Sequence, residues 1–162
     1  MELQHWHDFF VATAGAAAAL TGLIFVGVSI NITRILSLPK LPDRALLSLI
    51  LLLNILVISM LMLIPGQSAF LVSMELAFIA AAVYSQITKM DINIYRGTGI
   101  AYQRQYRVSL IFNQVSMLPY LVSAVTVFQC GLSGICWLVP AIIISFIKAV
   151  VDAWVLLVEI NR

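Results

Sequence analysis

Two residues of opposite charge, Lys148 and Asp152, interrupt the apolar C-terminal part of the sequence. Side chains four residues apart lie on one face of an α-helix, so this ammonium and carboxylate can pair. Ionisable groups inside a membrane are costly and mark functional sites by default. At about 1.5 Å of rise per residue, Asn54 falls at a depth similar to that of Lys148, whereas Glu75 lies nearer the outer surface. We therefore predict one intramembrane polar cluster of Lys148, Asp152 and Asn54. Glu75 is either a separate site or a protonated carboxyl.

The predicted cluster has two interpretations. It is either a structural ion pair, with Lys148 extending its ammonium towards the inner surface of the membrane, or part of a pathway for an ion or a proton. Catalysis has little support, because the chain has no Gly-x-Ser-x-Gly, His-Glu-x-x-His or Cys-x-x-Cys motif. His5, His7 and Asp8 are close enough in sequence to hold a metal, but two histidines are a weak signal. We predict no enzymatic activity, no cofactor and no metal.

Cys130 and Cys136 flank the short segment from Gly131 to Ile135. A tight turn there could bring the two α-carbons within the separation of about 4.4–6.8 Å that a disulfide requires. The alternative is two free thiols that pack as small apolar groups. The sequence leaves both open, as a possible disulfide or a pair of free cysteines.

Composition indicates the solvent that surrounds these residues. Of the 162 residues, 62% are hydrophobic and 10% are charged, and the net charge is +2. A soluble domain carries about 25% charged residues, so this chain has too few to cover a surface that faces water. The small net charge does not favour nucleic acid as a partner. Residues 1–162 are predicted to form a single all-α domain, an integral membrane bundle of five transmembrane helices at about 9–32, 45–64, 69–88, 108–129 and 135–158.

Basic residues predict the orientation, because Lys and Arg accumulate on the cytoplasmic side of a membrane. Eight of the nine lie on one side of the five-helix arrangement, which predicts N-out/C-in: Arg34, Lys40, Arg44, Lys89, Arg96, Arg104, Arg107 and Arg162. Within the connection at 89–107, Arg96, Arg104 and Arg107 are expected to meet anionic lipid headgroups at the cytoplasmic face. The alternative for this connection is a site for a phosphate or a partner protein.

The first predicted helix is rich in small residues. Gly15, Gly22 and Ser29 recur every seven residues, and Ala18 lies between the first two. Small side chains let membrane helices approach closely, so we predict a helix-packing seam. The seam packs either within its own bundle or against another chain, as in a homo-oligomer.

The same helix carries a resemblance to a known group of sequences. The segments Trp6–Phe10, Ala18–Val26 and Ser29–Asn31 resemble the start of a group of small, largely uncharacterised bacterial multi-pass membrane proteins. The resemblance covers about the first 30 residues, as a short motif does. It implies a location in the bacterial cytoplasmic (inner) membrane.

Two functions are compatible with these features. The first is a self-associating membrane protein that forms or lines a pathway for an ion or a proton, supported by the seam and by the intramembrane cluster. The alternative is an accessory or regulatory subunit of a larger membrane complex, with the first helix as its docking face.

Overall fold

A computed structural model describes residues 2–37, 41–96 and 103–160, and within these ranges the chain is helical apart from short turns. Long apolar runs explain this, because only a helix satisfies every backbone polar group within a single segment. The helices are α1 (Glu2–Ile30), α2 (Ile32–Ser37), α3 (Leu41–Met62), α4 (Ala69–Arg96), α5 (Gln103–Cys130), the 3₁₀ helix η2 (Gly131–Trp137) and α6 (Leu138–Ile160). Each predicted helix corresponds to one of the five long helices α1, α3, α4, α5 and α6.

Within the described residues, four helical stretches are long and apolar enough to cross a membrane. They are Trp6–Ile30, Leu41–Met62, Ala69–Ile94 and Arg107–Leu156. The last stretch has 50 residues and contains most of α5, all of η2 and most of α6. The prediction of an all-helical fold is therefore confirmed, and the four apolar stretches are consistent with a membrane protein.

The predicted boundaries are wrong in the region of residues 89–107. We expected the third helix to end at residue 88, whereas α4 continues to Arg96. We also expected the next helix to begin at residue 108, whereas α5 begins at Gln103. The physical reason is that a helix can continue beyond the apolar layer, so the first charged residues after an apolar run do not mark the end of the helix. The difference matters because it places Asp91 inside α4.

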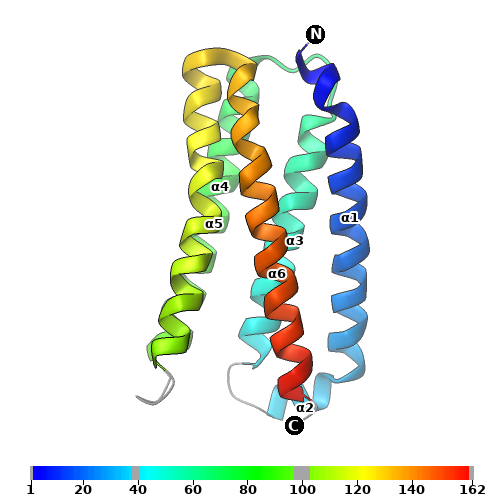
Figure 1. Cartoon of the computed structure of the whole chain (residues 1–162), viewed down its shortest axis with the longest axis vertical. Coiled ribbons are helices and arrows are strands. Elements are labelled where there is room, and N and C mark those ends of the chain that lie inside the picture. The colour runs from blue at the N-terminus through cyan, green and yellow to red at the C-terminus, as the bar shows by residue number, and fades with distance from the viewer. Residues whose placement is uncertain (1, 38–40, 97–102, 161–162) are drawn as a thin grey trace.

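The long helices run side by side, with the N-terminus at one end of the bundle and the C-terminus at the other (Figure 1). α1 packs mainly on α3, α4 packs on α5, and α6 lies against both α3 and α5. α3 supplies much of the core, including the fully buried side chains of Leu51, Ile55 and Ile58. α1 is the most exposed of the long helices, and only Phe10 and Ala17 are buried on it among its described side chains.

A compact joint connects α5 to α6. Gly131 adopts a left-handed backbone with φ of +76°, which favours glycine. A Cβ atom on Gly134 would lie 2.5 Å from the backbone nitrogen of Val127, so this glycine lets η2 pack directly on α5. The hydroxyls of Ser123 and Thr126 donate to the Gly134 carbonyl at 3.1 and 3.4 Å. We expected a simple loop here and helix 135–158 directly after it, but the chain forms a 3₁₀ helix that fixes α5 and α6 together at this end.

Candidate intramembrane polar site

Lys148 lies at the centre of a polar cluster between α5 and α6. Its side chain is only 4% exposed. The ammonium donates to Asp152 Oδ2 one turn along α6. It also donates to the Ser109 hydroxyl on α5 at 3.2 Å. The structure thus contains the ion pair that the four-residue spacing predicts, and it adds a hydrogen bond to a neighbouring helix.

A buried carboxyl, Asp91, joins α4 to α5. The side-chain amide of Asn113 donates to Asp91 Oδ1 at 2.8 Å, and both residues are buried. Beside them, the amide of Gln114 donates to the Thr88 hydroxyl at 3.2 Å. Asp91 Oδ2 and Asn113 Oδ1 are buried without a hydrogen-bond partner in the described part of the chain. Such atoms are costly in an apolar interior, so they mark a place where a water or a proton would be stabilised.

Asp91 is not among the site residues predicted from the sequence, because the third helix was expected to end at residue 88. A signal was nevertheless present. The buried positions Ile87, Asp91 and Ile94 are four and three residues apart, so Asp91 continues the buried face of α4. The sequence signal for Asp91 as a site residue is therefore a carboxyl that lies on the buried face of a helix.

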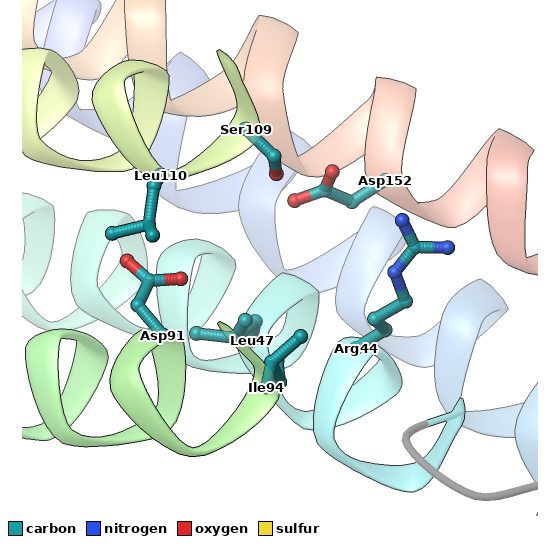
Figure 2. A pocket seen from close by; sticks show the side chains of 7 residues that line it. All are labelled: Arg44, Leu47, Asp91, Ile94, Ser109, Leu110 and Asp152. Carbon is teal, nitrogen blue, oxygen red and sulfur yellow. The ribbon is translucent and has the colours of Figure 1, made fainter. Parts of the chain in front are cut away.

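A small cavity separates the two carboxyls (Figure 2). Its volume is about 20 Å³, and its lining includes Asp91, Ser109, Asp152 and Arg44. Figure 2 shows Ser109 and Asp152 turned towards each other, with the guanidinium of Arg44 on the far side of Asp152. A volume above about 10–15 Å³ is enough for one water molecule. The cavity can therefore hold one water between carboxyls that belong to α4 and α6.

Polar side chains continue from this cluster along one face of α5. Ser109, Asn113, Ser116, Tyr120 and Ser123 are spaced by four, three, four and three residues, and all but Ser109 are buried. This spacing keeps them on one helical face for about 21 Å, at 1.5 Å per residue. We call these five residues the polar stripe. Its periodicity is visible in the sequence, but the stripe was not among the predicted features.

Asn54 lies beside the polar stripe. It faces the Tyr120 hydroxyl, which itself donates to Ser145 at 3.3 Å. Neither amide atom of Asn54 has a hydrogen-bond partner in the described part of the chain. The described partners of Lys148 are Ser109 and Asp152, so the structure does not bring Asn54 into hydrogen-bond contact with that pair. Equal rise along two helices gave a similar depth but did not indicate which neighbours each side chain would contact.

Glu75 is separate from this site. It accepts a hydrogen bond of 2.9 Å from the Gln67 amide, near the end of the bundle where α3 joins α4. This position agrees with the interpretation of Glu75 as a separate site.

The small-residue seam faces away from the bundle. Gly15, Ala18, Gly22 and Ser29 are all exposed, and a Cβ atom on either glycine would meet no atom of another described segment within 4 Å. The alternative in which these four residues pack within their own bundle is therefore wrong. The seam is open to lipid or to another chain.

The remaining predicted residues are placed as follows. Cys130 and Cys136 are free and exposed, so the possible disulfide is absent from this structure. Arg107 is exposed, whereas the side chains of Arg96 and Arg104 lie outside the described residues. His7 contacts the adjacent Asp8 at 3.3 Å. The side chain of His5 is likewise outside the described residues, and those that are described contain no group of three potential metal ligands.

No protein-family model, curated protein or solved structure matches this chain. The resemblance of its first helix to bacterial membrane proteins therefore stays a prediction. The function has to be argued from the polar site, its neighbouring cavity and the exposed faces of the bundle.

Proposed function

We propose that this protein self-associates in the bacterial inner membrane and conducts protons along the polar stripe of α5. The observation that carries this proposal is a row of polar side chains, most of them buried, along one face of α5. They extend from Asp91 and the Lys148–Asp152 pair to Ser123, inside an otherwise apolar bundle. Polar groups within a membrane are costly, so such a line of them favours a pathway over a purely structural core.

The chemistry of the cluster suits a proton better than a hydrated cation. A carboxyl can take up and release a proton, and hydroxyl groups can both donate and accept one. Asp91 and Asp152 flank a cavity of about 20 Å³ that has room for about one water. That water would connect the two carboxyls, and the Ser109 hydroxyl lies on the same cavity. Lys148 holds Asp152 in place from the other side.

Five membrane spans are part of the proposal. The stretch Arg107–Leu156 has 50 residues, more than twice the length of about 20 that one span needs. η2 reverses the chain near its middle, so α5 and α6 would each cross the membrane (Figure 1). The predicted N-out/C-in orientation follows from the eight basic residues on one side of this arrangement.

Self-association is supported by the position of the small-residue seam. A helix whose small residues lie on its outer face can approach a second copy closely, and van der Waals packing then stabilises the contact. Gly15 and Gly22 are open to such an approach.

Proton flux into liposomes tests the proposed pathway. Purified protein is reconstituted with a pH-sensitive dye inside the vesicles, and a potassium gradient with valinomycin drives protons inwards. We expect Asp91→Asn to reduce the flux about tenfold or more, because removal of a positioned proton-transfer group typically costs about 10²–10⁴-fold. The matched control is Glu75→Gln, which also neutralises a carboxyl but lies away from the cluster. Flux equal to that of empty vesicles for the unmodified protein, or an equal effect of both variants, would contradict the proposal.

The accessory-subunit alternative is favoured by one specific observation. α1 packs mainly on α3 and leaves much of its surface exposed, including Leu23 at 69% and Phe25 at 62%. A single size measurement in detergent separates the alternatives. A homomer supports self-association, whereas a heteromer with a stoichiometric second protein supports the accessory role.

A further inference from the structure

Three buried polar side chains from three helices lie together in the middle of the bundle. Asn54 belongs to α3, Tyr120 to α5 and Ser145 to α6, and they are 3%, 0% and 0% exposed. Asn54 is thirteen residues from the start of α3 and eight from its end. At 1.5 Å per residue these separations are about 20 and 12 Å, so the three side chains are far from either end of the helix. We call them the central triad.

The hydrogen bonds of the central triad are incomplete. The Tyr120 hydroxyl donates to Ser145 at 3.3 Å, whereas the usual O–H···O separation is about 2.5–3.0 Å. Asn54 faces the Tyr120 hydroxyl, but its amide nitrogen and oxygen have no hydrogen-bond partner in the described part of the chain. An unpaired amide is costly in an apolar interior. The triad therefore presents donors and acceptors that do not satisfy one another.

These groups suit a water molecule as their common partner. A buried water is stabilised by about two to four polar groups. The Asn54 amide has both N–H donors and an acceptor oxygen, and the two hydroxyls can each donate or accept. None of the three side chains carries a charge, so the triad does not favour an ion. The long Tyr120–Ser145 separation and the unbonded amide leave room between the polar atoms.

The polar stripe needs a water at this depth to carry protons. Side chains three or four residues apart on a helix have Cβ atoms about 5–6 Å apart, whereas proton transfer requires heavy atoms about 2.6–3.2 Å apart. On one side of Tyr120 the Ser116 hydroxyl donates to the Asn113 carbonyl, and on the other the Ser123 hydroxyl donates to the Gly134 carbonyl. The described hydrogen bonds therefore do not connect Tyr120 to its neighbours in the stripe.

We propose that the central triad binds one water molecule and that Asn54 is its positioning residue. The water takes up a proton from one hydroxyl neighbour as it releases a proton to the next, and the Asn54 amide holds it without exchanging a proton itself. The binding of the water is independent of conduction, whereas its part in proton transfer rests on the proposed function.

Asn54→Leu tests the water site by the direction of its effect on stability. In a dry triad the leucine removes two unpaired buried polar atoms, which raises the melting temperature. In a hydrated triad it removes satisfied hydrogen bonds and leaves the hydroxyls without the water, which lowers the melting temperature. We expect a lower melting temperature, measured in detergent by the helical circular dichroism signal. A higher one would overturn the water site.

A crystal structure of the unmodified protein gives a second, direct measurement. We expect an ordered water within about 3.2 Å of both the Asn54 amide and the Tyr120 hydroxyl. A direct hydrogen bond between these two side chains, with no water between them, would overturn the site.

Proton flux into liposomes tests the part of the water in conduction. Asn54→Leu should reduce the flux about tenfold or more, because proton-transfer groups typically contribute about 10²–10⁴-fold. Asn54→Ser should restore much of the flux, because a smaller polar side chain still holds water. Tyr120→Phe keeps the aromatic ring and should also reduce the flux, which provides a second variant if Asn54→Leu does not fold. The matched control is Ser59→Ala on α3, whose buried hydroxyl contacts Thr13 of α1 at 2.8 Å, and its flux should be unchanged.

The flux results separate this inference from the proposed function. Unchanged flux in Asn54→Leu and Tyr120→Phe, with a conducting unmodified protein, would overturn the transfer role of the water but not the pathway. Absence of flux in the unmodified protein would overturn the pathway and the transfer role together. The melting temperature and the crystal structure would decide the water site in either case.

Discussion

Replacing Asp152 by leucine should destabilise the protein more than replacing both members of its ion pair. In Asp152→Leu the Lys148 ammonium stays 4% exposed and, among the described residues, keeps its 3.2 Å hydrogen bond to Ser109. A buried charge that loses its counterion is strongly destabilising. The double variant Lys148→Leu/Asp152→Leu replaces both charges by apolar side chains and leaves no such charge behind.

The magnitude follows from the burial of each partner. Removing one member of a buried ion pair costs about 3–5 kcal/mol, whereas replacing both members by apolar residues is often neutral. Since Lys148 is 4% and Asp152 is 19% exposed, Asp152→Leu should cost about 3 kcal/mol or more. Lys148→Leu should cost less, because the remaining carboxylate is more exposed and faces Arg44 (Figure 2). The double variant should lie within about 1 kcal/mol of the unmodified protein, the residual loss being one hydrogen bond to Ser109.

Reversible unfolding in a defined detergent measures these differences, with helical circular dichroism as the signal. Glu75→Leu is the matched control, because its carboxyl accepts a hydrogen bond from a neutral amide, Gln67. Its loss should cost about 0.5–1.5 kcal/mol. A double variant that loses the sum of the two single losses would refute the reasoning, since additive effects mean that the two charges do not interact.

Two further predictions concern the exposed faces of the bundle. Gly22→Leu should leave the melting temperature of the monomer unchanged but reduce the size of the oligomer in detergent, because a Cβ atom on Gly22 would meet no neighbouring segment within 4 Å in the described part of the chain. Ala16→Leu, exposed on another face of α1, is its control, and an unchanged oligomer in Gly22→Leu would contradict the seam. A membrane-impermeant maleimide should label Cys130 and Cys136 on intact cells without reductant, because both thiols are free and lie at the end of the bundle predicted to face outwards. Labelling only after reduction would indicate a disulfide, and labelling only after permeabilisation would reverse the orientation.

The sequence was sufficient to predict which segments form long helices, because unbroken apolar runs of membrane length have few alternatives to a helix. It was also sufficient for the Lys148–Asp152 pair, whose contact depends only on helical spacing within α6. Local geometry determines both features.

Contacts between helices were harder to predict. Asn54 faces Tyr120 rather than Lys148, and depth along a helix does not determine which neighbour a side chain meets. Asp91 was missed because a charge was treated as the end of α4, although a buried face can continue past a charged residue on the opposite side. The 3₁₀ geometry of η2 depends on the contact of Gly134 with the α5 backbone, which local sequence alone does not indicate.

η2 connects α5 to α6, so a change in the angle between these two helices at η2 moves their far ends relative to each other. Lys148 lies eleven residues beyond Trp137, the last residue of η2, which is about 16 Å at 1.5 Å per residue. A change of about 5° in the angle between α5 and α6 would therefore displace Lys148 by about 1.4 Å relative to α5. That displacement is enough to break its 3.2 Å hydrogen bond to Ser109. The integrity of the polar cluster therefore depends on the angle between α5 and α6 at η2.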